Sequence, residues 1–340
     1  MNKQGQHPQL ARHSRYTAKR YARPLAAAVL ATVMLGTGGA LPASLLNGAY
    51  AASSTNATAT TGAKQAVSAD TAQRSYNLFV QRLQKPSTLG LARATLVNRI
   101  KQFDPYRASI AVLQLENAYM KHMDYASNLI YKESIQDELL RNYKGNMTIQ
   151  QAAATLTRKA DRAALQQLGE MGYRLETSEG VFYPIIDYPA FSTFFPYINA
   201  DIKDYINIMA AEVKAPTAYD AGIVIPASEL LKRGLAMETF LNRYPVSNRR
   251  IAVADNYRLM KFYIFSGSDN TLLFDPQTSE IDPQFVAGYR KVLNSYSAQQ
   301  IKNSQLLTNV SDLLKLVDQN GGKSTSAVEQ FLKQRVGDLF

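Results

Sequence analysis

Residues 172–191, GYRLETSEGVFYPIIDYPAF, interrupt an otherwise helical pattern. Two short β-prone runs, residues 173–177 and 181–186, flank the tetrapeptide TSEG, which suits a type I turn closed by Gly180. Pro184 cannot donate a ladder hydrogen bond, so its strand belongs at the edge of a sheet. The stretch therefore predicts a β-hairpin set between helices.

On the N-terminal side of the hairpin, apolar residues recur with the 3.6-residue period of amphipathic helices from about Asp70 onward. One long apolar face runs from Val112 to Ile130. A capping box at residues 148–151 starts a further helix, because its threonine hydroxyl and glutamine amide satisfy free backbone groups. We expect that helix to continue to Gly172, which suits a left-handed C-terminal stop.

On the C-terminal side, cap residues and prolines mark further helix starts at Asn199, Pro226 and residues 282–283, and a last strong apolar pattern begins at Leu306. We find no internal repeat of fixed period. The sequence predicts a mainly α fold, a multi-helix, bundle-like body of about eight helices with one small β-hairpin at about residues 173–186.

The first 51 residues have the three-part composition of a secretory signal peptide. Six Lys and Arg residues and no acidic residue precede an apolar run, LAAAVLATVML, at residues 25–35. Ala49 and Ala51 then place small residues at the two positions that a signal peptidase reads. We expect export and cleavage before Ala52. An uncleaved N-terminal anchor is the alternative, disfavoured because the apolar run is short for a membrane span of about 20 residues.

The predicted organisation has three parts: residues 1–51 as signal peptide, residues 52–68 as a flexible Ala/Ser/Thr-rich spacer, and residues 69–340 as a helical domain. If the helical domain is divided, its two halves meet near residues 172–198. The part that follows the signal is long enough to bury a substantial core.

Charge and cysteine content restrict the function. The chain has 38 basic and 27 acidic residues, a net charge of +11, but six of the basic residues lie in the predicted signal, so 32 remain against 27. This mild, dispersed surplus argues against nucleic acid as a partner and is compatible with an anionic wall or membrane surface. The absence of cysteine excludes disulfides, thiolate metal sites and cysteine nucleophiles.

Few residues remain for catalysis. His122 is the single histidine after the predicted signal, and it lies beside apolar helical positions, which favours a packed rather than a catalytic role. The sequence has no H-E-x-x-H motif, no phosphate-binding glycine loop and no EF-hand loop. We therefore expect no metal site and no cofactor.

Carboxylates are the one type of catalytic group present in quantity. Glu170 ends a predicted helix, Glu179 lies in the hairpin turn and Asp187 follows the second strand, a layout that glycan-cleaving enzymes also use. Such an enzyme needs one protonated carboxyl in an apolar site and often a second carboxylate across the bond. Glu238 lies near apolar helical positions and is expected to be a buried carboxylate with hydrogen-bond partners.

Aromatic residues crowd the hairpin and the segment after it. Rings of this number bury a large area when they pack, so they either fill the core or form an exposed groove for a sugar or a hydrophobic partner. The absence of tryptophan weakens the sugar alternative. The candidate binding residues are Phe182, Tyr183, Tyr188, Phe191 and Phe194.

These observations favour a secreted or cell-envelope helical protein of bacterial type that has no catalytic activity. It would bind a cell-wall polymer, an anionic membrane surface or an envelope protein through the aromatic hairpin segment. The alternative is a carboxylate-dependent hydrolase of peptidoglycan-type glycan. A structural spacer without a ligand is the third possibility, and it requires that the hairpin rings are all buried.

Overall fold

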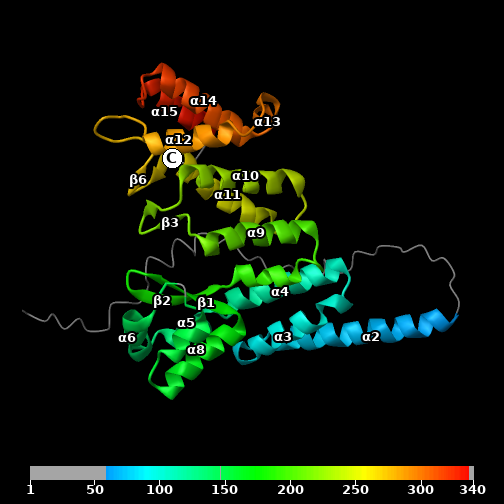
Figure 1. Cartoon of the computed structure of the whole chain (residues 1–340). Coiled ribbons are helices and arrows are strands. Elements are labelled where there is room, and N and C mark those ends of the chain that lie inside the picture. The colour runs from blue at the N-terminus through cyan, green and yellow to red at the C-terminus, as the bar shows by residue number, and fades with distance from the viewer. Residues whose placement is uncertain (1–58, 146, 337–340) are drawn as a thin grey trace, which may run out of the picture.

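The computed structural model describes residues 59–145 and 147–336 (Figure 1). The predicted signal peptide, with Ala49, Ala51 and Ala52 at its cleavage site, lies outside the described residues. Helix α2 begins at Ala59, so residues 59–68 of the predicted spacer belong to a helix. Alanine, which is frequent in this segment, has the highest helix propensity of the amino acids.

The N-terminal half forms the lower layer in Figure 1. It consists of helices joined by short turns and ends in the β-hairpin. The helices are α2 (Ala59–Arg82), α3 (Leu89–Arg99), α4 (Pro105–Lys121), α5 (Met123–Ile130), α6 (Glu133–Asn142), α7 (Ile149–Ala154) and α8 (Lys159–Met171), with the 3-10 turns η2 (Pro86–Thr88) and η3 (Ile100–Gln102).

Two of the predicted long helices are each divided in two. The apolar face from Val112 to Ile130 is split between α4 and α5 at His122, whose ring Nε2 donates to the carbonyl of Leu83 at 2.9 Å. The buried histidine therefore has a structural partner, as expected. The helix that starts at the capping box of Thr148 stops after Ala154, and α8 resumes at Lys159.

The hairpin pairs β1 (Tyr173–Ser178) with β2 (Val181–Ile186), and its register confirms the predicted strands. Its turn differs from the predicted type I turn, because Glu179 and Gly180 have φ angles of 51° and 76°. Two left-handed residues in a two-residue loop match the right-handed twist of the strands, whereas a type I turn would splay them. Gly172 has a φ of 103°, which confirms the predicted left-handed helix end.

The C-terminal half continues upward from the hairpin, through α9 to the helices at the top (Figure 1). Its helices are α9 (Ala200–Lys214), α10 (Ala227–Arg243), α11 (Arg250–Ser266), α12 (Pro283–Leu293), α13 (Ala298–Lys302), α14 (Gln305–Gln319) and α15 (Ser326–Val336). Two further ladders, each of two-residue strands, pair β3 (Ala218–Tyr219) with β4 (Gly222–Ile223) and β5 (Gly267–Ser268) with β6 (Thr271–Leu272).

Helix α10 is the centre of this half, since it packs against α9, α11, α12 and α14. Gly288 on α12 permits the close approach of α12 to the start of α10. A Cβ atom at this glycine would lie 2.7 Å from the backbone nitrogen of Ser228. A packed helix with neighbours on several sides leaves only a narrow exposed ridge, and this ridge of α10 separates the two clefts described below.

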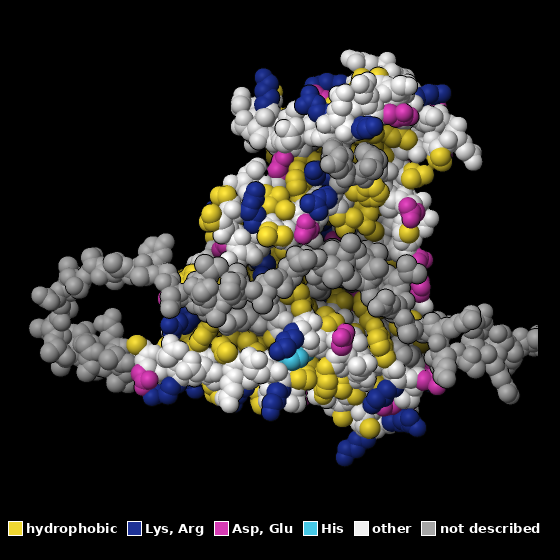
Figure 2. All heavy atoms as spheres, turned by 180° about the vertical axis from the view of Figure 1, so that it is seen from behind, with side chains coloured by type: hydrophobic (Ala, Val, Ile, Leu, Met, Phe, Trp, Pro, Cys, Tyr) yellow, Lys and Arg dark blue, Asp and Glu magenta, His cyan; other side chains and the backbone are white. Residues whose placement is uncertain are grey.

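The buried apolar residues form one cluster that extends from α2 to α15. The fold is mainly α with a small β-hairpin, as the sequence predicts. No helix in the described ranges has both the length and the apolar character needed to cross a membrane. On the face shown in Figure 2, Lys and Arg side chains occur on both the lower layer and the upper helices, with acidic side chains among them.

Candidate functional site

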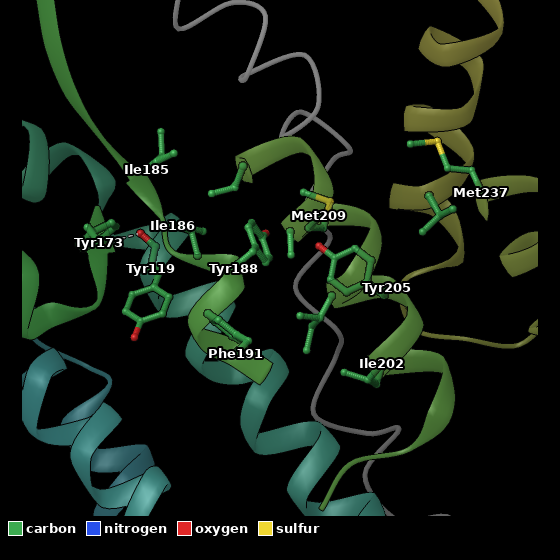
Figure 3. Packing of buried hydrophobic residues seen from close by; sticks show 14 of the residues in the cluster. Tyr119, Tyr173, Ile185, Ile186, Tyr188, Phe191, Ile202, Tyr205, Met209 and Met237 are labelled. Atoms are coloured by element: carbon green, nitrogen blue, oxygen red, sulfur yellow. Dashed lines mark hydrogen bonds between the residues drawn. The ribbon is translucent and has the colours of Figure 1, made fainter. Parts of the chain in front are cut away.

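The aromatic candidates lie in the core. Phe182 of β2 and Tyr188, Phe191 and Phe194 of the 3-10 helix η4 (Tyr188–Phe194) are each no more than 4% exposed, and Tyr183 is half-buried. Figure 3 shows Tyr188 and Phe191 among other buried side chains of the core. Four of the five rings therefore do not line an open hollow, and their burial accounts for this aromatic segment through packing.

Neighbouring helices supply the ring contacts. Tyr119 of α4 packs edge-on against Phe191 with ring centroids 6.0 Å apart, and Tyr143 packs against Phe182 at 5.1 Å. Phe191 in turn contacts Phe194. Edge-to-face pairs of this kind stabilise a core beyond the area that they bury. The segment closes the N-terminal half against α9 rather than presenting rings to solvent.

None of the three candidate carboxylates lines either of the two clefts described below. Glu170 is exposed near the end of α8, whereas Glu179 is exposed in the turn at the far end of the hairpin. Six residues of extended strand separate the two ends of the hairpin by about 20 Å. The carboxyl pairs of glycoside hydrolases lie about 5–9.5 Å apart. Glu170 and Glu179 therefore do not form such a pair.

Asp187 lies at the other end of the hairpin from Glu179, where its backbone N–H donates to the carbonyl of Gly172 at 3.4 Å. The nearby phenol of Tyr119 has a pKa well above its ordinary value, mainly because it is buried. Arg93 opposes this rise and the negative charge of Asp187 adds to it. Asp187 thus belongs to the hairpin base, at the opposite end of the hairpin from Glu179, and it lines neither of the two clefts described below.

A buried ion pair that the sequence analysis missed joins the two halves. Glu116 of α4 is almost completely buried, and one of its oxygens accepts hydrogen bonds from the hydroxyls of Tyr188, at 2.6 Å, and Tyr205. Its other oxygen accepts from Nε and Nη2 of Arg249, at 3.0 and 2.6 Å. The guanidinium also lies over the Tyr205 ring, 5.5 Å from its centroid. Figure 3 shows Tyr188 and Tyr205 beside each other.

The electrostatics of this cluster agree with its geometry. Burial raises the pKa of the Tyr188 and Tyr205 phenols well above the ordinary value, and the negative charge of Glu116 raises it further. Burial alone would lower the pKa of Arg249, but Glu116, Tyr205 and Tyr188 together outweigh this effect, so the pKa is raised. The two phenols and the guanidinium are thereby held in their protonated forms. The cluster connects the two halves through a buried charge pair.

One signal for this cluster is present in the sequence. Glu116 falls on the same helical face as Val112 and Tyr119, at positions that the apolar period assigns to the core. A carboxylate at such a position requires a buried donor. The donors lie 72, 89 and 133 residues away, and periodicity does not identify partners at such distances.

Glu238 of α10 is also buried and satisfied, as expected. Its oxygens accept from the backbone N–H of Leu306 at 2.8 Å, from the hydroxyl of Ser304, and from Tyr257 at 3.3 Å. The first two donors lie at the N-terminus of α14, where a negative charge also interacts favourably with the helix dipole. Glu238 thus holds α14 against α10.

A first cleft of about 480 Å³ opens beside this contact, between α10 and the segment around α13. Most of the residues that line it carry an amide or hydroxyl group, and one aromatic ring, that of Tyr296, contributes. The residues that line it are Leu235, Glu238, Thr239, Asn242, Arg243, Tyr296, Gln300, Asn303, Ser304 and Leu307.

Several polar groups in the first cleft have no protein partner. Among the described residues, the side chains of Thr239, Asn242 and Tyr296 make no hydrogen bond. The carbonyl oxygens of Asn303 and Gln300 accept from Gln299 and from the backbone of Ser297, respectively, which leaves their amide N–H groups for another acceptor. The cleft thus offers both donors and acceptors to a neutral polar ligand.

A second cleft of about 370 Å³ lies on the opposite side of α10, against α9. Its apolar part is formed by Ile208, Ala211, Met237 and Phe240. Charged residues surround this floor, and Arg233 is held among them by Glu212 at 3.0 Å and Glu229 at 3.2 Å. Glu229 thus pairs with Arg233, one turn further along α10.

No group of three or more acidic or histidine side chains in the described ranges is arranged to hold a metal ion. The chain was compared with protein-family models, curated proteins and solved structures, and none of the three comparisons finds a match.

Proposed function

We propose that this chain is exported and acts by binding, and that the first cleft is its binding site. The observation that carries this proposal is the group of unpartnered hydroxyl and amide side chains around that cleft, at Thr239, Asn242 and Tyr296. Binding sites combine a concave surface with a few convergent polar groups, and the cleft volume of about 480 Å³ falls in the range of such sites.

The lining favours a neutral ligand that is rich in hydroxyl or amide groups. Amide side chains donate and accept at once, which matches the mixed hydrogen bonding of a sugar or an acylated amino sugar. The Tyr296 ring adds a flat apolar surface for the face of a sugar ring. For an exported protein, a cell-wall polymer has this chemistry, so the wall is the ligand that we propose.

A co-sedimentation assay tests this proposal. Purified protein corresponding to residues 52–340 is mixed with insoluble peptidoglycan, and the bound fraction is measured. We expect retention of the unaltered protein and about tenfold weaker retention of the double variant Asn242→Ala/Tyr296→Ala, because two ligand contacts are lost. The matched control is Asn248→Ala/Tyr106→Ala, which removes the same residue types from exposed positions outside both clefts.

The other outcomes of the assay identify the competing functions. If the cleft variant and the control variant are retained equally, the binding site does not lie in the first cleft. Retention on vesicles of anionic lipid, but not on peptidoglycan, would point to a membrane surface instead. Release of reducing ends from peptidoglycan, lost in Glu170→Gln or Glu179→Gln, would support the hydrolase alternative.

Export forms part of the same proposal. Its support is the sequence of residues 1–51, with the small residues Ala49 and Ala51 before the expected cleavage point. N-terminal sequencing of protein recovered from the cell surface or the medium should begin at Ala52. Intact protein starting at Met1 and confined to the cytosol would contradict both export and a wall ligand.

A further inference from the structure

The exposed ridge of α10 separates the two clefts. Lys232, Ala236, Thr239 and Arg243 are all exposed, and their spacing of four, three and four residues places them along one face of the helix. The first cleft lies on one flank of this ridge and the second cleft on the other. Thr239 lines both.

The ridge is low where the clefts meet. Long basic side chains stand at its two ends, Lys232 and Arg243, which are separated by about 16 Å along the helix axis. Between them, Ala236 and Thr239 present only a methyl group and a short hydroxyl-bearing side chain. A ligand that leaves the first cleft can therefore pass over Thr239 into the second cleft without displacing a large side chain.

We propose that the two clefts together form one site for a linear polymer of N-acetylated amino sugars, which crosses α10 at Thr239. This inference rests on the proposed function, in which the first cleft binds a wall polymer. The amides of Asn242 and Asn303 suit the hydroxyl and acetamido groups of the chain. The apolar floor of the second cleft, at Met237 and Phe240, suits an acetamido methyl group.

The same features argue against an extended peptide as the ligand. A peptide that binds as an added strand requires an unpaired strand edge, whereas both clefts are lined mainly by helices, whose backbone groups are already hydrogen-bonded. A helical peptide requires a continuous apolar groove, whereas hydroxyl- and amide-bearing side chains interrupt the apolar surface of the first cleft. The clefts therefore suit a ligand whose hydroxyl and amide groups bind to side chains rather than to the backbone.

The geometry requires a ligand of some length. A helix with its side chains is about 10 Å across, so one sugar ring in the first cleft does not reach the second. The ligand gains contacts in the second cleft only when it is long enough to cross the ridge of α10. Affinity should then rise stepwise with chain length, because the second contact becomes intramolecular.

Calorimetric titration with soluble chitin oligosaccharides, from the disaccharide to the hexasaccharide, tests this inference. We expect the hexasaccharide to bind the unaltered protein about tenfold or more tightly than the disaccharide does. Ala236→Leu raises the ridge and narrows the entry to the second cleft. It should reduce hexasaccharide affinity to that of the disaccharide and leave disaccharide affinity unchanged. Thr239→Leu provides a second variant at the crossing point.

The control for Ala236→Leu is Ala163→Leu, the same change at an exposed position of α8, which should preserve both affinities. Circular dichroism confirms that each variant is folded. Equal affinity for the two oligosaccharides, or a hexasaccharide advantage that survives in both ridge variants, would overturn the two-cleft site and leave the proposed function standing.

Failure of every oligosaccharide to bind would overturn the amino-sugar inference. If peptidoglycan is then still retained in an Asn242- and Tyr296-dependent manner, the peptide part of the wall is the ligand. If peptidoglycan is not retained either, the proposed function fails as well.

Discussion

Arg249, in the loop between α10 and α11, donates two hydrogen bonds to a single carboxylate oxygen of Glu116, which lies 133 positions earlier in the chain. The carboxylate side chain is 2% exposed and the guanidinium side chain 16%. Tyr188 and Tyr205 saturate the other oxygen. The N-terminal and C-terminal halves are thus joined by a buried charge pair in addition to their apolar contact.

Loss of Arg249 should destabilise the fold strongly. Arg249→Ala leaves the Glu116 carboxylate buried without its cation, and breaking a buried pair in this way costs about 3–5 kcal/mol. Urea unfolding followed by circular dichroism measures the change. Arg250→Ala is the matched control, since the Arg250 side chain is exposed and donates to the carbonyl of Leu241, so the change in its unfolding free energy should stay within about 0.5 kcal/mol. Similar losses in the two variants would contradict the importance of the buried pair.

Alkaline titration should separate two classes of tyrosine. Burial raises the pKa of Tyr188, Tyr205 and Tyr289 well above the ordinary value of 10.0, with Glu116 adding to the rise for the first two. Below pH 10 these phenols are protonated in both the folded and the unfolded state, so they confer no pH dependence. Above pH 10 only the unfolded chain ionises them, so the free energy of unfolding falls as the pH rises.

Phenolate absorbance and circular dichroism, recorded together against pH, test this expectation. A late absorbance phase should coincide with loss of helical signal, and Tyr289→Phe should reduce the amplitude of that phase alone. Complete ionisation of all tyrosines while the helical signal persists would show that the buried phenols are accessible.

Gly288→Ala should destabilise the contact between α12 and α10. The new Cβ atom would lie 2.7 Å from both the Cβ of Ala227 and the backbone nitrogen of Ser228, so a helix must move. Overpacking of this kind costs about 1–3 kcal/mol. The control is Gly145→Ala, where no atom lies within 4 Å of the added carbon. A thermal midpoint that falls no further in Gly288→Ala than in the control would contradict this packing.

The hairpin turn should become more stable when Glu179 is replaced by Asn. Glu179 has a φ of 51°, a left-handed conformation that asparagine adopts with less strain and that type I′ turns favour. We expect a gain of about 0.5–1 kcal/mol, with Glu179→Val giving a loss. Peptidoglycan retention by the Asn variant should be unchanged, since Glu179 lines neither cleft. A stability order with Val above Asn would contradict the turn geometry.

Local signals in the sequence predicted the elements that depend on a few neighbouring residues. The strands at residues 173–186, the left-handed Gly172, the capping box of Thr148 with Gln151, and the helix start at Asp282 all occur where expected. Each of these is fixed by hydrogen bonds or backbone preferences within a few positions, so a short window contains the necessary information.

The residue pattern of α11 does not predict a helix. This helix has apolar side chains on opposite faces, since Val253 and Met260 are buried while Ile251 is 73% exposed. A helix without a single apolar stripe lacks the period from which helices are predicted. The pattern from Val112 to Ile130, in contrast, predicts a single helix because its apolar period is unbroken. Its period continues past His122, where a hydrogen bond to the distant Leu83 accompanies the break.

The sequence by itself determined a mainly helical chain, a hairpin and its position, and a composition without cysteine and with one histidine after residue 51. Only the tertiary structure decided that Tyr188, Phe191 and Phe194 are buried, that Glu116 meets Arg249, and that two clefts flank α10. Secondary structure follows from interactions between near neighbours, whereas burial and cleft shape depend on how residues far apart in the chain pack together.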